Sequence, residues 1–321
     1  MNSSLKSIEL LALCISLIIL ASCTIETAKE SSDKHLYIAS DYLEVKDSVL
    51  FQEFEKEMDV AVHIIPIQPD ELISSLQKDG LNSDFDIIMV KSLYHLYKLY
   101  KRNLLHPIYL EDLLDEQTCS YSSWKFRFVA LGIDPYILAW NPNYVTQTKT
   151  YEDLTRSEYF TDFQPSENVP FLSSVLRKKN RVKGNNWIKM FSSNAADIAL
   201  ASDSLIEHGI ILTTYSDFNT NSPVAKHFKG KSCFFPNSNG MGTLFNVRSI
   251  SLVNQAQNYV NGRKFISFYT DSIRNIELNK NLKTMSVFGN DYNCIYHSDP
   301  PNNLVSYYSM VERVLNKVKN R

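Results

Sequence analysis

Cys23 is the residue whose neighbours most clearly specify a chemical modification. It follows Leu20-Ala21-Ser22, which ends an apolar run that begins at Leu10, and Lys6 precedes that run. The run is too short to span a bilayer stably, and a short apolar segment that ends in small residues is typical of a secretory signal peptide. A Cys directly after the small residues resembles a lipobox. We therefore expect Cys23 to be lipidated and to become the first residue of the mature protein.

Lipidation would divide the start of the chain into two segments. Residues 1–22 are then a lipoprotein signal peptide, and residues 23–34 are a flexible, polar tether. Acyl chains anchor firmly, because each buried CH₂ contributes about 0.8 kcal/mol. The expected location is outside the cytoplasm, on the outer side of the cytoplasmic membrane or in the periplasm. An uncleaved membrane anchor that happens to contain a Cys is the alternative.

The composition of the whole chain is that of a globular protein. Hydrophobic residues make up 44% of the 321 residues and charged residues 21%, and no later stretch is apolar for long enough to cross a membrane. The net charge of −2 argues against a nucleic-acid surface. Three Cys remain after the lipid site, Cys119, Cys233 and Cys294, and their spacing matches no zinc pattern. They allow at most one internal disulfide, and their pairing stays open.

Motifs for catalysis or for a resident metal are missing from the sequence. Asp217, Asn219 and Asn221 alternate as in a calcium loop, but Ser222 and Phe228 occupy the positions that need Gly and Glu. The seven His show no metal spacing, and no GxSxG, P-loop or HExxH motif occurs. We therefore expect no enzyme and no cofactor.

The first third of the chain alternates between strand-like and helix-like patterns. Strands are predicted at 36–39, 60–65 and 86–90, with helices at 49–58, from Pro69 to a stop at Gly80, and at 93–99. The helix at 49–58 has an apolar face made of Val49, Leu50, Phe51, Phe54 and Met58. Strands and helices that alternate with short connections indicate a parallel sheet covered on both faces. Ligands tend to bind at the carboxyl edge of such a sheet.

Short motifs also follow one another in a specific order along almost the whole chain. In the first part they are Leu36-Tyr37, Asp41-Tyr42, Phe54-Glu55-Lys56-Glu57, Asp70-Glu71-Leu72, Asp79-Gly80, Asn82-Ser83, Asp86-Ile87-Ile88 and Asn103-Leu104-Leu105-His106-Pro107. Later ones are Tyr136–Asn141, Thr150–Leu154, Cys233-Phe234-Phe235-Pro236-Asn237, Gly240-Met241-Gly242-Thr243 and Asn246-Val247. This series resembles bacterial extracellular solute-binding proteins, in particular the ferric-iron-binding receptors of ABC transporters.

The resemblance implies an α/β fold of the type II periplasmic-binding-protein class. Its two lobes would each hold a mainly parallel sheet flanked by helices, with a hinge between them. Residues 35–135 would form the first part of lobe 1, residues 136–243 lobe 2, and residues 244–321 the return to lobe 1 and the C-terminal helices. Between Trp187 and Asp197 the chain is shorter than the family. Gly240 and Gly242 would form a turn before the return crossing, where glycine's freedom in φ is useful.

The family's metal ligands are mostly missing when they are carried over one at a time. Members place a His or Tyr after the first strand, often a carboxylate after the third element, and an adjacent Tyr pair in the second lobe. The corresponding positions here are Asp41-Tyr42, Pro66, and Ser204-Leu205, while a further second-lobe Tyr falls near Val169. Ferric iron prefers phenolate, carboxylate and imidazole donors. Tyr42 and Asp41 are therefore the only metal-ligand candidates that the resemblance retains, and Tyr215 lies near the lost Tyr pair.

The resemblance predicts a lipid-anchored substrate-binding component of an ABC importer. Its partners would be a permease in the cytoplasmic membrane and a small-molecule or metal ligand, with ferric iron as a cargo to be tested, and the protein would be a monomer. The predicted ligand-binding residues are Asp41, Tyr42, Ser202, Asp203, Ser204, Ser238, Asn239 and Gly240. The alternative is a surface lipoprotein that keeps the fold, has lost transport and serves an interaction role. The missing Tyr pair favours that alternative.

Replacement of Cys23 by Ser should abolish lipid attachment, because the thiol is the acyl acceptor in this interpretation. Cells grown with labelled fatty acid should incorporate label into the wild-type chain and not into Cys23→Ser, and Cys119→Ser should be labelled like the wild type. Equal labelling of the wild type and Cys23→Ser would show that Cys23 is not the acyl acceptor.

Overall fold

The computed structural model describes most of the chain beyond residue 33. The described residues are 34–79, 83–108, 127–140, 150–155, 161–162, 168–196, 210–219, 232–234, 242–287 and 301–319. Residues 34–321 form one compact unit. The predicted signal peptide, the lipid site Cys23 and all but the last residue of the predicted tether lie outside the described residues.

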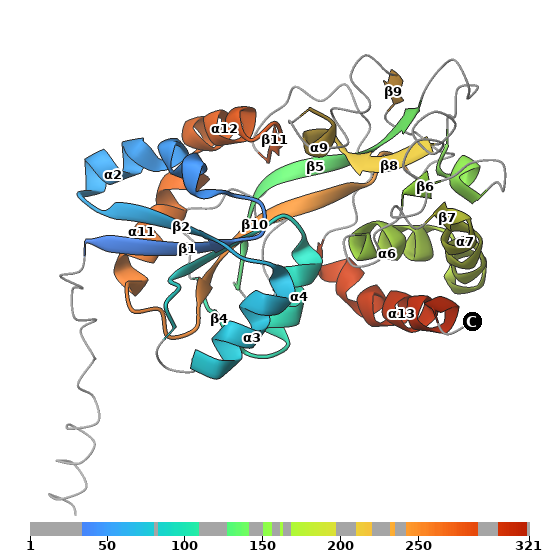
Figure 1. The fold of residues 1–321 in the computed structure, drawn as a ribbon, viewed down its shortest axis with the longest axis horizontal. Helices are drawn as coiled ribbons and strands as arrows, with labels where there is room; N and C mark the ends of the chain where they lie inside the picture. Colours follow the sequence, from blue (N-terminus) through green and yellow to red (C-terminus); the bar gives the residue numbers. More distant parts are fainter. Residues whose placement is uncertain are drawn as a thin grey trace, which may run out of the picture. The chain divides into compact units, whose positions relative to one another are not determined.

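The described residues form short strands and helices that alternate along the chain (Figure 1). In order they are β1 (His35–Ser40), η1 (Val45–Phe51), α2 (Gln52–Met58), β2 (Ala61–Pro66), α3 (Pro69–Asp79), β3 (Ile87–Val90), α4 (Leu93–Tyr100), β4 (Leu105–His106), β5 (Val129–Trp140), η2 (Tyr151–Thr155), β6 (Thr161–Asp162), α6 (Val169–Lys178), α7 (Arg181–Asn194), β7 (Ala195–Ala196), β8 (Ile210–Thr214), α9 (Tyr215–Asn219), β9 (Ser232–Phe234), β10 (Phe245–Val253), α11 (Tyr259–Thr270), α12 (Ser272–Asn281), β11 (Met285–Ser286) and α13 (Pro301–Lys319).

The predicted strands and helices of the first third of the chain are confirmed, with one change. A 3-10 turn, η1, precedes α2 and begins at Val45, because Glu44 and Asp47 form a reciprocal capping box there. The tighter turn changes the helical phase, since 3-10 helices have three residues per turn. Phe51 and Phe54 are buried as expected, but Val49 and Met58 are exposed, so the predicted apolar face was wrong at those two positions.

The strands join into one mixed sheet with the order β2-β1-β3-β10-β5-β8-β6-β7. β1 pairs in parallel with β2 and with β3, and β6 pairs in parallel with β7 and with β8. The two long strands β5 and β10 are antiparallel to each other and to their outer neighbours β8 and β3. The parallel groups at the two ends fit the parallel sheets that were expected for the two lobes. The antiparallel strands β5 and β10 join these groups into one mixed sheet, where two mainly parallel sheets were expected.

β5 connects the two groups of strands. All twelve of its residues are buried, and it changes partners between Pro135, which pairs with Phe245 of β10, and Tyr136, which pairs with Thr214 of β8. We call the strands on the β10 side the first sheet part and those on the β8 side the second sheet part. The domain limits at residues 135, 243 and 244 remain predictions.

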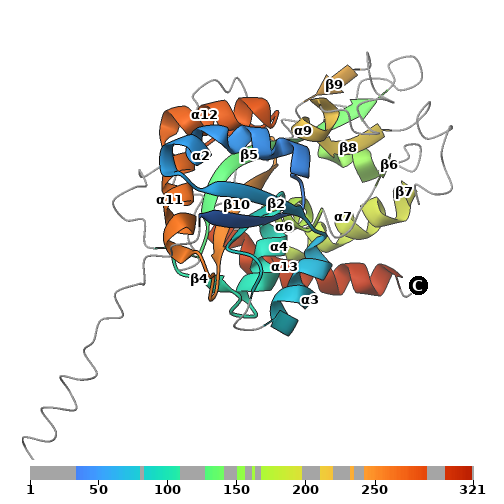
Figure 2. The same ribbon diagram turned by 60° about the vertical axis from the view of Figure 1, so that its left-hand side comes forward.

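Helices α2, α11 and α12 lie together on one side of the sheet, and α3, α4 and α13 lie on the other (Figures 1 and 2). A hydrophobic cluster fills the space between the sheet and each group of helices. On one face, Phe51 and Phe54 pack edge-to-face against Phe265 of α11, with ring centroids 5.2 and 5.0 Å apart. The other cluster includes buried residues of α3, α4, α6, α7 and α13. Burial on both faces explains why β3 reads Ile-Ile-Met-Val without a polar residue.

Gly242 has a φ of 68°, which confirms the unusual backbone predicted for this glycine before the return strand. Gly240 lies outside the described residues, as do Cys119 and Cys294. Among the described helices, none is both long and apolar enough to cross a membrane.

Gly184 lies where α7 comes close to α6. A Cβ atom at this position would lie 2.8 Å from Cα and from Cδ1 of Leu176 and 3.2 Å from its carbonyl oxygen. Leu176 is fully buried, and α13 packs against both helices. Because two of these atoms belong to the backbone, an added methyl group would force the helices apart.

Gly184→Ala should therefore destabilise the protein, although Gly→Ala inside a helix usually stabilises. Overpacking of this kind costs about 1–3 kcal/mol. Denaturant unfolding followed by circular dichroism would measure the change. Val182→Ala is the matched control, because Val182 lies in the same helix and is 71% exposed. An unchanged or raised midpoint for Gly184→Ala would show that the two helices are not this close.

Candidate functional site

The candidate site begins where β1 and β3 end. These strands are parallel neighbours, so the residues that follow them, Asp41 and Lys91, meet at the same edge. Asp41 Oδ1 accepts a hydrogen bond from the backbone nitrogen of Lys91 at 2.7 Å, and Asp41 Oδ2 accepts one from Nδ1 of His95 at 2.8 Å. Both carboxylate oxygens thus already bind the start of the α4 region, which fixes this loop.

Tyr42 presents a buried hydroxyl at the same edge. Its Oη has no hydrogen-bond partner among the described residues, and the Arg248 guanidinium lies over its ring at 4.6 Å from the centroid. Burial raises the pKa of the Tyr42 phenol, Arg248 opposes this rise and Asp41 adds to it. The phenol is therefore neutral at physiological pH. A buried polar group without a partner costs about 1–3 kcal/mol, so Tyr42 Oη is suited to a ligand.

Arg248 is held by a buried network that joins the two sheet parts. Its Nη2 donates to Ser216 Oγ at 2.7 Å and to Asp134 Oδ2 at 3.3 Å. Asp134 is fully buried and also accepts from the Ser216 backbone nitrogen at 2.9 Å and from its hydroxyl at 2.5 Å. The register of β10 against β5 shifts between Arg248 and Ser249, and a bulge of this kind re-aims side chains.

Two further polar atoms on β10 have no hydrogen-bond partner among the described residues. They are Nε of Arg248 and Oδ1 of Asn246, both buried. The two residues are two positions apart on one strand and therefore share a face. An unpaired guanidinium N–H beside an unpaired phenol is an arrangement that a ligand with carboxylate or similar oxygens would satisfy.

An ion pair links the two sheet parts across this edge. Lys91 Nζ lies 2.5 Å from Asp217 Oδ2, and the side chains are 24% and 33% exposed. The same Asp217 oxygen accepts from Thr214 Oγ1 at 3.0 Å. Partly exposed pairs contribute little, about 0–1 kcal/mol, so this contact can open and close at low cost.

The structure brings together only part of the predicted site. Asp41 and Tyr42 lie beside Lys91 and Arg248, while the predicted Ser202, Asp203, Ser204, Ser238, Asn239 and Gly240 lie outside the described residues. Asp134, Arg248 and the Lys91–Asp217 pair were missed. The sequence did contain a signal for Asp134 and Arg248, because each is the single charged residue of its strand. The two strands read VALGIDPYILAW and FNVRSISLV. The alternation that begins at Asp217 resembled a calcium loop and did not indicate an ion pair with Lys91.

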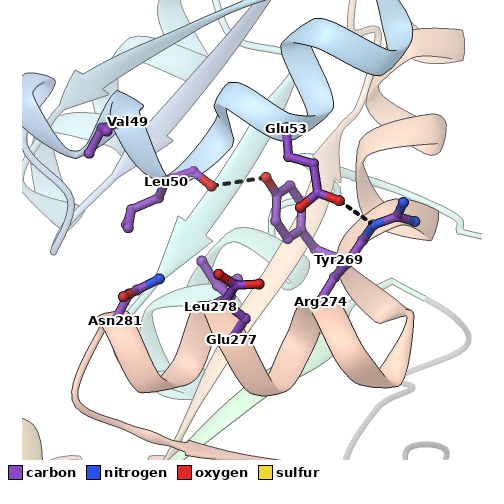
Figure 3. Close-up of a pocket in the computed structure, with 8 residues that line it drawn as sticks. All are labelled: Val49, Leu50, Glu53, Tyr269, Arg274, Glu277, Leu278 and Asn281. Carbon is purple, nitrogen blue, oxygen red and sulfur yellow. Dashed lines mark hydrogen bonds and ion pairs between the residues drawn. The ribbon is translucent and has the colours of Figure 1, made fainter.

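No group of three or more His, Cys, Asp or Glu side chains in the described part of the chain is arranged to hold a metal. A cavity of about 310 Å³ lies elsewhere, lined by Val49, Leu50, Glu53, Tyr269, Arg274, Glu277, Leu278 and Asn281 (Figure 3). Tyr269 Oη donates to the Leu50 carbonyl at 3.1 Å, and Arg274 Nε donates to Glu53 at 3.3 Å. These polar groups already satisfy one another, and no candidate residue lines the cavity.

Proteins similar to this chain were found by sequence and by structure. No protein-family model matches the chain. Iron uptake protein A1 of Synechocystis is 24% identical over 265 residues, which cover 76% of this chain and 72% of that protein. The ferric binding protein of Campylobacter jejuni superimposes with a TM-score of 0.75 at 19% identity, and a Trichodesmium FutA protein in complex with iron and citrate with 0.72 at 18%. Each superposition covers 88% of this chain and 99% of the other.

The chain has the type II periplasmic-binding-protein fold. This confirms the predicted fold class, and the resemblance to ferric-iron receptors holds in sequence and in structure. The prediction that the protein is not an enzyme agrees with the names of these relatives, which describe iron uptake and ferric binding.

Asp134→Ala should destabilise the protein strongly, because it leaves the Arg248 charge buried without its carboxylate. Removal of one partner of a buried ion pair typically costs about 3–5 kcal/mol. Thermal and denaturant unfolding would measure the loss. Asp70→Ala is the matched control, since the Lys98–Asp70 pair is exposed on its acidic side, and it should leave the midpoint nearly unchanged. Similar midpoints for the two variants would mean that water reaches Arg248.

Proposed function

We propose that this protein is the lipid-anchored substrate-binding component of an ABC importer for iron. The sequence relative named for iron uptake and the structural neighbours named for ferric binding support this reading. Attachment through Cys23 would keep the protein at the outer side of the cytoplasmic membrane, beside its permease. The two sheet parts would close over the ligand by hinge motion, as binding proteins of this class do.

The observation that carries the proposal is the unpaired, buried hydroxyl of Tyr42 beside Arg248. Ferric iron is a hard cation that binds phenolate oxygen, and its charge lowers the pKa of a coordinating phenol. Metal binding would therefore lower the pKa of the Tyr42 phenol, which burial raises in the free protein. The coordinated phenolate would also gain a favourable interaction with the neighbouring guanidinium.

Tyr42 alone cannot bind iron tightly, so the rest of the coordination must come from elsewhere. Ser204 and Leu205 stand where the family has its Tyr pair. A cargo of ferric iron chelated by a small carboxylate would supply the missing oxygens itself. Arg248 Nε is a donor that such a carboxylate could occupy, and the Trichodesmium neighbour contains iron together with citrate.

Asp217 is the described carboxylate best placed to respond to this cargo from the second sheet part. It follows Ser216, which binds Arg248, and in the free protein it pairs with Lys91. A ligand that competes for either partner would change the contact between the sheet parts. A ligand whose contacts differ between the open and the closed state couples binding to closure.

The second candidate is a surface lipoprotein that keeps the fold and no longer transports. The loss of the Tyr pair at Ser204 and Leu205 favours it. Uptake of radiolabelled ferric citrate by cells with and without the gene separates the two, because only a transport component changes the uptake rate.

Ferric citrate should give a visible phenolate-to-iron absorption band with the purified protein. The band should disappear in Tyr42→Phe, because the phenolate oxygen is gone, and should persist in Tyr100→Phe, a control on α4. Ferric ion with carbonate should give little or no band, since carbonate supplies fewer oxygens than citrate. A band that survives Tyr42→Phe would indicate another tyrosine, with Tyr215 the first to test. No band with either ferric form would rule out binding through Tyr42.

A further inference from the structure

Three aromatic side chains, two exposed and one half-buried, form a cluster at the opposite end of β1 from the candidate site. His35 and Tyr37 lie two residues apart on β1, and His63 of β2 is the register partner of Tyr37. All three therefore project from the same face of the sheet. Further along this face Ala39 and Ile65 are packed into the hydrophobic core, whereas His35 and His63 are exposed.

The two imidazoles lie close enough to share a ligand. His35 Nδ1 is 2.8 Å from His63 Nε2, and the ring centroids are 5.0 Å apart. Tyr37 stacks on His63 at 5.0 Å, which limits the positions that the His63 ring can take. Parallel pairing of His35–Ser40 with Ala61–Pro66 holds the two backbones in fixed register.

We propose that His35 and His63 form a binding site for a divalent transition metal with tetragonal geometry, in particular Cu²⁺. Imidazole nitrogen is a preferred ligand of Cu²⁺, and Cu²⁺ binds nitrogen sites more tightly than other divalent ions of the first row. The ring that now donates the shared hydrogen bond moves its proton to its other nitrogen. Each ring then turns the lone pair of one ring nitrogen toward the metal, with water completing the coordination.

The separation of the two nitrogens is compatible with tetragonal geometry. With metal–nitrogen bonds of about 2.0 Å, two ligands at right angles lie about 2.8–2.9 Å apart, and two tetrahedral ligands lie about 3.3 Å apart. The observed 2.8 Å matches the first case. A tetrahedral Zn²⁺ would need the two strands or rings to separate by about 0.5 Å. This site differs from the proposed iron site, which uses phenolate oxygen at the other end of β1.

Pulsed electron paramagnetic resonance of the full-length chain with one equivalent of Cu²⁺ tests the proposal, after the thiols have been alkylated. The wild type should show modulation from two imidazole nitrogens. His35→Gln and His63→Gln should each lose at least one of them and weaken Cu²⁺ binding by about tenfold or more. His106→Gln is the matched control, because His106 lies on β4 and hydrogen-bonds its neighbour Pro107, and it should behave like the wild type.

Chemical modification of the wild type provides a test that does not depend on variants. Cu²⁺ should protect His35 and His63 from diethylpyrocarbonate and leave His106 unprotected, as read by mass spectrometry of peptides. Zn²⁺ should protect less at the same concentration. Two-imidazole modulation that persists in the His35→Gln/His63→Gln double variant would overturn the proposal. So would equal modification of both His with and without Cu²⁺, and stronger protection by Zn²⁺ would overturn the tetragonal assignment.

Discussion

The buried contact between Asp134 and Arg248 is the interaction on which the rest of the structure depends. The two residues lie on adjacent antiparallel strands, β5 and β10, which cross the middle of the sheet. A charge at 0% exposure, like that of Asp134, persists only with partners of opposite charge and with hydrogen bonds. Ser216 supplies two of those hydrogen bonds from the second sheet part. The network therefore fixes where the second sheet part meets the crossing strands.

The same network places a cation at the candidate site. Nη2 of Arg248 is held by Asp134 and Ser216, while Nε is left without a hydrogen-bond partner among the described residues. The guanidinium then covers one face of Tyr42. A structural requirement of the crossing strands thus creates a positive site for an anionic or chelated ligand. Loss of Asp134 would affect stability and ligand binding together.

Local patterns in the sequence predicted most of the first sheet part, and they failed where pairing is distant. Apolar runs between turn residues predicted the positions of β1, β2 and β3. The glycine-rich motif predicted an unusual backbone conformation, and Gly242 has a φ of 68°. The capping box at Glu44 and Asp47 starts a 3-10 turn that the spacing of the apolar residues does not indicate, so the exposure of Val49 was not predicted. The local pattern alone could not predict the fold class, because the antiparallel pairing of β5 with β10 joins segments more than a hundred residues apart. The resemblance to solute-binding proteins supplied this part of the prediction.

The candidate site was less predictable, for a physical reason. Asp41 and Tyr42 follow a strand directly, so the parallel-sheet rule places them at the ligand edge. Arg248 reaches Tyr42 only through a strand bulge and a buried carboxylate 114 residues away, which no local pattern encodes. Each charge taken alone in a buried strand nevertheless requires a partner, because unpaired burial costs several kcal/mol. Two such strands, one with Asp134 and one with Arg248, could therefore have been matched to each other by charge alone.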